Sequence, residues 1–220
     1  MLSHADIDAA RRGDLRQLKL IVEDLPYLIN GSARDNTLLT AAASHGQLTA
    51  VKLLLVSGAD VNGVGTFGTT PLSCAAINGH LDVLRTLLDT GAAVDIPDLH
   101  GHMPLVAAAS RGHAECVKLL SAYGASRAPS PDGRGAEFWA RVLGRHDLGD
   151  WLEATAHWTP LHHIEQLTPE RAARLIGCGA DVYAGVPSPL ERARQVGGEV
   201  GEVVVAAATA VAAALSSGDR

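Results

Sequence analysis

A glycine-rich segment at residues 63–68 has the spacing of a dinucleotide-binding fingerprint, G-x-G-x-x-G. That chemistry needs a strand before the glycines and a helix directly after them, so that the pyrophosphate lies at the helix N-terminus. Here a helix-ending sequence, Gly-Ala-Asp at 58–60, comes shortly before the motif. Thr-Thr-Pro at 69–71 then separates the motif from the next helical pattern. The glycines are therefore predicted to form a turn between helices, and no cofactor is expected.

Ten histidines raise the question of metal binding or acid–base catalysis. His157, His162 and His163 lie close together, but no HExxH or Cys-x-x-Cys pattern accompanies them. His80 and His113 each directly follow a glycine and are predicted to cap turns. The three cysteines have no short spacing and are expected to be small core residues. We expect neither catalytic residues nor metal ligands, and no enzymatic activity.

The composition favours helices packed on helices. Apolar residues make up 47% of the 220 residues but aromatic residues only 4%, while glycine and alanine are abundant. A sandwich or barrel normally uses bulky β-branched and aromatic side chains, which are scarce here. The formal net charge of −6 argues against a nucleic-acid partner, because phosphate binding needs a basic surface.

The sequence carries no signal for secretion or membrane insertion. The first eight residues include two acids, Asp6 and Asp8, where a signal peptide has basic residues followed by an apolar run. The longest apolar stretch, residues 203–215, is shorter than the ~20 residues that span a bilayer. An odd number of scattered cysteines fits a reducing compartment. We expect a soluble cytoplasmic protein with no membrane partner.

The chain contains an internal repeat. Glycines recur at equal intervals at Gly13, Gly46, Gly79 and Gly112. Alanine pairs recur in the same register at Ala9-Ala10, Ala42-Ala43, Ala75-Ala76 and Ala108-Ala109. Because unrelated residue types share one period, the sequence predicts copies of one structural unit.

The sequence of each repeat predicts two short helices. Thr70-Pro71 begins the first, since threonine caps free backbone N–H groups and proline suits the first helical position. The first helix is predicted over residues 72–78 and ends at Gly79. The second is predicted over 81–89, with one apolar stripe, and Gly91 ends it in a left-handed conformation. Such a unit cannot bury its apolar stripe alone, so neighbouring copies must stack.

These residues resemble the ankyrin-repeat family, whose period equals the interval between these glycines. The resemblance is carried by Thr-Pro-Leu-Ser-Cys-Ala-Ala at 70–76 with Gly79-His80, by 53–62, by Gly112-His113, and by Thr-Pro-Leu-His at 159–162 with Gly-Ala-Asp-Val at 179–182. It implies an all-α fold, a solenoid of stacked helix-turn-helix units with a capping repeat at each end.

The register predicts one solenoid over residues 1–220. Its units are an N-terminal capping repeat at 1–30, regular repeats at 31–62, 63–95 and 96–127, a degenerate repeat at 128–157, a repeat at 158–184 and a C-terminal capping repeat at 185–220. Two domains separated near 130–157 are the alternative, because that segment keeps apolar spacing but loses the motif.

The resemblance implies non-catalytic recognition of a partner protein through a concave surface of turn tips and inner helix faces. The corresponding positions are Arg34, Asn36, Ser44, His45, Thr66, Phe67, Thr69, Ile77, Asn78, Leu99, His100, His102, Ser110 and Arg111. We expect an adaptor or scaffold that binds one or more proteins. The alternative is a constitutive structural subunit of a larger protein assembly, held by its convex face and C-terminal helix.

Two sets of residues are candidate anchors within that surface. Phe67 and Leu99 are large apolar residues at turn tips that should be solvated, with Arg34 and Arg111 flanking them. The alternative for Phe67 is that its ring folds back onto the neighbouring turn. Three tryptophans and a phenylalanine also fall within the irregular segment, at Phe138, Trp139, Trp151 and Trp158. They predict either a compensating small core or a pocket for a peptide or partner subunit.

Overall fold

The computed structural model describes residues 2–33, 36–185 and 187–217. They group into two compact units, Met1–Leu120 with Ala125–Glu153, and Ser121–Gly124 with Ala154–Arg220. Among the described residues only two very short strands interrupt a helical fold, which confirms the all-α prediction. None of the helices in these ranges is both long and apolar enough to cross a membrane.

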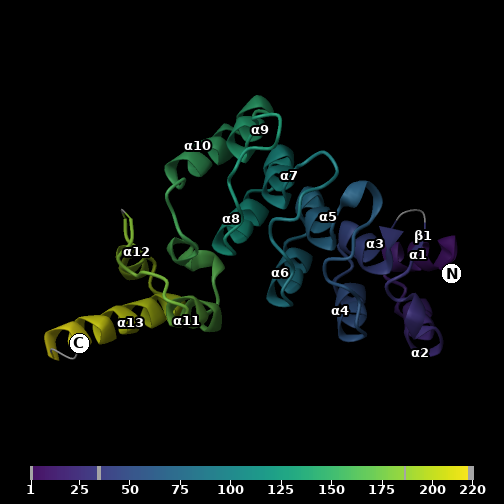
Figure 1. The fold of residues 1–220 in the computed structure, drawn as a ribbon, viewed down its shortest axis with the longest axis horizontal. Coiled ribbons are helices and arrows are strands. Elements are labelled where there is room, and N and C mark those ends of the chain that lie inside the picture. Colours follow the sequence, from purple (N-terminus) through teal and green to yellow (C-terminus); the bar gives the residue numbers. More distant parts are fainter. Residues whose placement is uncertain (1, 34–35, 186, 218–220) are drawn as a thin grey trace. The chain divides into compact units, whose positions relative to one another are not determined.

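The first unit is a series of helix pairs (Figure 1). Its helices are α1 (His4–Arg12), α2 (Leu15–Asp24), α3 (Leu38–Ser44), α4 (Leu48–Val56), α5 (Pro71–Asn78), α6 (Leu81–Asp89), α7 (Pro104–Arg111), α8 (Ala114–Ala122), α9 (Ala136–Val142) and α10 (His146–Ala154). The odd-numbered helices pack side by side from α1 to α9. We call them the inner row. Helices α2, α4 and α6 pack in the same order in a second row.

The turns between pairs carry the remaining elements of this unit. They are the 3₁₀ turns η1 (Pro26–Leu28) and η2 (Thr66–Gly68), and the strands β1 (Ser32–Ala33) and β2 (Asn36–Thr37). The strands pair antiparallel, with Ser32 opposite Thr37 and Ala33 opposite Asn36. The glycine-rich segment at 63–68 therefore lies in a turn, as predicted, and precedes the cap of α5 rather than opening a helix.

Local sequence explains where the helices begin and end. Thr70 is extended and its side chain accepts a hydrogen bond from the backbone N–H of Ser73, while Pro71 is the first helical residue. Gly79 ends α5 with φ 74°, the left-handed conformation that glycine adopts without a steric penalty. Helix α6 spans the predicted residues, and its stripe of Val83, Leu84, Leu87 and Leu88 is buried. The predicted two-helix unit is confirmed.

One side chain per repeat links it to the repeat before. The Gln47 side-chain amide donates to the Arg11 carbonyl at 2.9 Å. Nε2 of His80 and of His113 lies 3.2 Å from the carbonyls of Ser44 and Ile77. These histidines thus have the structural capping role that the sequence predicted, and each ring caps the end of the first helix of the preceding repeat.

The recurring glycine makes that link possible. A Cβ on Gly79 would lie 2.5 Å from Nδ1 of His113, and one on Gly46 would lie 2.7 Å from Nδ1 of His80. No real Cβ tolerates such a distance. Glycine recurs at this position for two reasons: the helix ends in a left-handed conformation, and the side chain of the next repeat needs the space that a Cβ would occupy.

A second set of hydrogen bonds links the other ends of the repeats. Side-chain oxygens of Asn30, Asn62 and Asp95 accept from backbone N–H groups of Asp60, Ala93 and Ser126, at 2.7, 2.9 and 2.9 Å. These acceptors follow the second helix of each repeat, so both ends of the helix pairs are held to the next copy. The predicted stacking of neighbouring repeats is thereby confirmed for this part of the chain.

The degenerate segment keeps the helix pair although it loses the motif. Helix α9 packs on α7 in the inner row, and α10 follows it. Arg145 takes the place of the histidine, since a Cβ on Gly112 would lie 2.5 Å from its Nε. The repeat geometry therefore extends into residues 128–153 without the ankyrin-like residues.

The second unit contains the 3₁₀ turns η3 (Pro160–His162) and η4 (Ile164–Gln166) and the helices α11 (Pro169–Gly177), α12 (Pro189–Val196) and α13 (Gly198–Ser217). Helix α13 packs on α11 and α12. The repeat predicted at 158–184 differs from expectation, since two 3₁₀ turns replace its first helix. Thr168 caps α11 in an extended conformation ahead of Pro169, so the preceding segment ends without a left-handed glycine. That all units form one solenoid stays a prediction.

Candidate functional site

The two large apolar residues at the turn tips lie on neighbouring turns. The Leu99 backbone N–H donates to the Phe67 carbonyl at 2.8 Å, which joins the tips. Phe67 is 63% exposed and Leu99 is 76% exposed. The Phe67 ring stacks at 6.4 Å from the His100 ring, which lies 6.1 Å from His102. Phe67 thus leans on the neighbouring turn but keeps most of its surface in solvent.

Phe67 also has an uncommon backbone conformation. Its φ of 58° and ψ of 21° are left-handed, and it is the only non-glycine residue with positive φ among those described. A left-handed conformation at a bulky residue costs of the order of 1–3 kcal/mol and persists only where surrounding structure imposes it. The surrounding structure therefore imposes a strained conformation on an exposed phenylalanine whose own packing does not require it.

Beside these tips the inner row contains a pocket of about 390 Å³, which we call the inner-row pocket. It is lined by Ile77, Asp98, His102, Val106, Ala107, Ser110, Arg111, Trp139 and Leu143. These residues come from α5, the turn before α7, α7 itself, and α9 with the residue after it. Its size is typical of ligand-binding pockets, and it is mostly apolar with a few polar groups.

The pocket brings together four of the predicted positions, Ile77, His102, Ser110 and Arg111. The others lie elsewhere on the same row or its turns. Asn36 is in β2, Asn78 donates to the Cys74 carbonyl at 2.8 Å, and Thr69 precedes the cap of α5. Arg34 and the side chain of Thr66 lie outside the described residues.

Four lining residues were missed by sequence reasoning, namely Asp98, Val106, Ala107 and Leu143. Trp139 was predicted only as part of a small core or of a pocket in the irregular segment, not as part of the inner row. Gly144 follows Gly112 by one residue less than the repeat period, so Trp139 and Leu143 correspond to Ala107 and Arg111. Shifting the columns by one residue in the degenerate segment would have identified Leu143 as an inner-row position.

The two charged residues of the pocket differ in how they are engaged. Oδ1 of Asp98 accepts from the backbone N–H groups of His100 and His102 at 2.8 and 2.9 Å, and its Oδ2 lies 3.5 Å from Nδ1 of His102. The exposed Arg111 guanidinium makes no ion pair or hydrogen bond with any described residue. Asp98 therefore shapes the turn, whereas Arg111 is available to a ligand.

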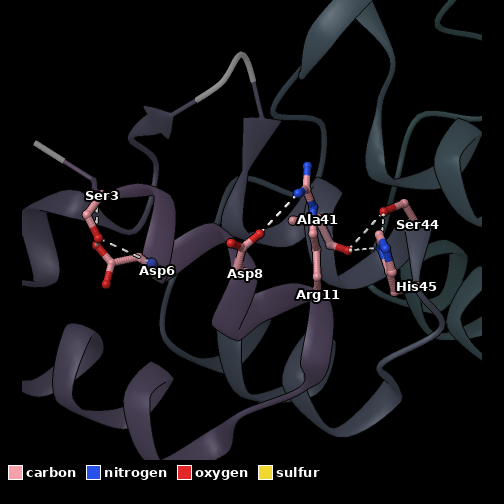
Figure 2. A network of polar contacts seen from close by, with 7 residues as sticks. All are labelled: Ser3, Asp6, Asp8, Arg11, Ala41, Ser44 and His45. Atoms are coloured by element: carbon pink, nitrogen blue, oxygen red, sulfur yellow. Dashed lines mark hydrogen bonds and ion pairs between the residues drawn. The ribbon is translucent and has the colours of Figure 1, made fainter.

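At the N-terminal end the inner row is polar (Figure 2). Asp8 and Arg11 on α1 form an ion pair at 3.1 Å. Ser44 donates to the Ala41 carbonyl at 2.9 Å, and Nδ1 of the exposed His45 lies 2.8 Å from the Ser44 hydroxyl oxygen. His45, a predicted site residue, is thus held against its own helix end, and this stretch offers hydrogen-bonding groups.

The aromatic residues of the irregular segment have separate partners. Phe138 and Trp139 pack edge to face at 5.6 Å, with the Arg134 guanidinium over both rings. The Arg127 guanidinium lies over Trp151 at 5.5 Å. In the second unit, Trp158 stacks on His162 at 5.8 Å. Trp139 is the member of this group that lines the pocket.

The two thiols whose pKa values are shifted are both less acidic than a free cysteine. Burial raises the pKa of the Cys74 thiol, against a hydrogen bond from Thr69, and burial with the nearby Glu115 raises the pKa of Cys116 to about 11. Reactive thiols have a lowered pKa, so neither fits a nucleophile. Cys178, expected in the core, is exposed because it lies just past the end of α11.

The histidine group at 157–163 is mostly structural. His162 is buried, and its Nδ1 accepts from the Thr159 backbone N–H at 2.9 Å. Burial lowers the pKa of His162, and the nearby His157 adds to the shift, against hydrogen bonds with backbone groups. In the described ranges, no three histidine, cysteine, aspartate or glutamate side chains come together as a metal site.

The stacked helix pairs define a helix-turn-helix repeat protein, and comparison with known families gives its class. Residues 7–98 match the model of ankyrin repeats in three copies, and residues 100–130 match that of a single ankyrin repeat. Together these matches cover more than half of the chain, so the protein belongs to the ankyrin-repeat family. No curated protein matches the sequence. Ankyrin repeats are generally protein–protein interaction modules and are typically non-catalytic.

Proposed function

We propose that this protein is a non-catalytic adaptor or scaffold that binds a partner protein through the turn tips and inner row of its first unit. The observation that carries the proposal is the strained and exposed Phe67 beside the exposed Leu99, next to the inner-row pocket. Aromatic residues and arginine are the types most enriched among residues that dominate binding energy. Phe67, Trp139 and Arg111 supply these types within one surface.

The proposal extends to location. Three free cysteines in the described residues fit a reducing compartment, and we propose the cytoplasm. There the surface would recruit a protein without chemical change to it.

A double substitution of Phe67 and Arg111 to alanine tests the surface. We expect partner binding to weaken by about 2 kcal/mol or more, roughly thirtyfold, because both side chains are exposed and contribute to no core. Quantitative affinity enrichment from the native source, with crosslinks mapped to residues, identifies the partner, and titration gives its affinity. The circular-dichroism spectrum should not change.

A matched control uses the second row. Val56 is 89% exposed and Lys52 is exposed on the same helix, α4. Alanine at both positions removes one apolar and one basic side chain without touching the inner row, and binding should persist. Equal binding by the Phe67/Arg111 variant and the parent would show that the surface is wrong. Loss of binding in the control alone would instead favour a structural subunit held by its outer face.

A further inference from the structure

We propose that the inner-row pocket takes a bulky apolar side chain from an extended segment of the partner, and that Arg111 binds a carboxylate close to it in that segment. The inference rests on the proposed function and deepens it, because it gives the chemistry of the bound segment. The partner is thereby a protein with an exposed acidic and apolar stretch of a few residues.

The lining of the pocket favours an apolar occupant. Ile77, Val106, Ala107, Trp139 and Leu143 supply its walls, from three successive helices of the inner row. Leu143 is 49% exposed, so an apolar surface stays in contact with water until something covers it. Covering such a surface is favourable in proportion to the apolar area removed from water. An aliphatic or aromatic side chain meets this requirement.

The polar groups of the pocket decide the charge of the occupant. The Asp98 carboxylate already accepts from two backbone N–H groups and faces His102. The Ser110 hydroxyl donates to the Ala107 carbonyl at 2.8 Å. The Arg111 guanidinium has no partner among the described residues, so the remaining demand is for a negative group. Guanidinium and carboxylate form two parallel hydrogen bonds, which fixes geometry as well as charge.

The net charge of the molecule opposes binding of an acidic segment, so the attraction has to be local to the pocket. With a formal net charge of −6 the chain repels acidic partners. At 0.1 M salt this repulsion is largely screened between charges more than about 10 Å apart. Arg111 is the cation among the lining residues, whereas the Arg134 guanidinium over Trp139 is already paired with Asp132 at 3.8 Å. An acidic preference is therefore expected to come from Arg111. Reversing that one charge should abolish the preference, whereas reversing a distant one should not.

The row of rings between the turn tips and the pocket favours an extended segment as the ligand. The rings of Phe67, His100 and His102 follow one another at 6.4 and 6.1 Å, and His102 is itself part of the pocket wall. A chain that fills the pocket can continue along these rings toward Phe67. This favours an extended segment with a second apolar residue over an isolated side chain.

The test selects peptides from a random 12-residue phage library on the full chain and measures the affinity of synthetic winners by fluorescence anisotropy. We expect aspartate or glutamate to be enriched near leucine, isoleucine, methionine, phenylalanine or tryptophan. Each winner is compared with a copy in which its acidic residue is replaced by the amide. The library is the probe because the natural partner is not needed for this measurement.

Two substitutions and their controls locate the peptide. Leu143→Asp should weaken binding at least about tenfold, whereas Val142→Asp, at an exposed neighbour outside the pocket, should not. Arg111→Glu should weaken the acidic peptide at least about tenfold and its amide copy little. Lys52→Glu, on the second row, should affect neither. All four positions retain solvent exposure, so the variants should fold.

Each result tests a different part of the proposal. Peptides that bind Leu143→Asp like the parent overturn occupancy of the pocket. Peptides that need Leu143 but bind equally well as acid and amide overturn the role of Arg111. Failure to select any peptide overturns recognition of a short segment, while the proposed function still stands or falls with the partner enrichment on the Phe67/Arg111 variant.

Discussion

Phe67 shows how a single residue can be kept against its own conformational preference. Its left-handed backbone is fixed by the hydrogen bond from Leu99 and by the following Gly68, whose φ is 71°. An exposed residue gains little from burial, so the strain is not repaid by packing of its own. Positions of this kind often carry function, because selection retains a costly residue where binding needs it.

Replacing Phe67 with asparagine should therefore stabilise the protein by about 0.5–1 kcal/mol while weakening partner binding. Asparagine tolerates the left-handed region far better than phenylalanine. Thermal unfolding followed by circular dichroism measures the effect, and Leu99→Asn, at a similarly exposed tip without positive φ, should give no gain. A lower melting temperature for Phe67→Asn would mean that the ring contact with His100 outweighs the strain.

At the scale of the element, the glycine after each inner helix joins local and tertiary requirements. Gly79 ends α5 in a left-handed conformation, and the His113 ring of the next repeat lies where its Cβ would be. Gly91 ends α6 with φ 96° but faces open space. The two glycines therefore separate the cost of the conformation from the cost of the contact between repeats.

Gly79→Ala should destabilise the protein by about 2 kcal/mol or more, and Gly91→Ala by only about 1 kcal/mol, the cost of the left-handed conformation. Urea unfolding of both variants gives the difference. His113→Ala removes the obstructing ring, so adding it to Gly79→Ala should recover the steric part of the loss. Equal destabilisation by the two glycine variants would show that the ring moves aside freely.

At the scale of the whole molecule, the first unit is stabilised by contacts between neighbouring repeats rather than by one central core. The two sets of hydrogen bonds link adjacent repeats, and the apolar stripe of α6 is buried. In such arrays stability is close to a sum of unit and interface contributions. The second unit buries two histidine side chains, His162 and His163.

Acid should destabilise the second unit through His162. Burial lowers its pKa in the folded state, so the unfolded chain binds the proton more readily below about pH 6.5. Stability is therefore lost as pH falls through that value, by at most about 1.4 kcal/mol per pH unit for one proton. Amide hydrogen exchange of α11 and α12 between pH 7 and 5 measures it after correction for intrinsic rates. The same loss in His162→Asn would assign the effect to other groups.

Most of the repeat unit could be predicted from the sequence, because its determinants are local. Thr70, Pro71 and Gly79 act within one turn of the helix they begin or end, and the resulting α5 and α6 match the expected residues. The exception is the segment 160–166. There Thr-Pro-Leu-His predicted a helix, but the extended Thr168 before Pro169 and the lack of a closing glycine gave 3₁₀ turns.

By itself the sequence determined the period, the fold class and the turn-tip positions, since each follows from residue types repeated at fixed spacing. Only the tertiary structure decided which of those positions form a site. The inner-row pocket joins Ile77, Arg111 and Leu143 from three repeats, and its walls depend on how closely successive helices pack. The availability of Arg111 was likewise undecidable from spacing, because it depends on which neighbouring groups already hold hydrogen bonds. Local sequence sets backbone conformation, whereas the convergence and engagement of side chains are set by packing between repeats.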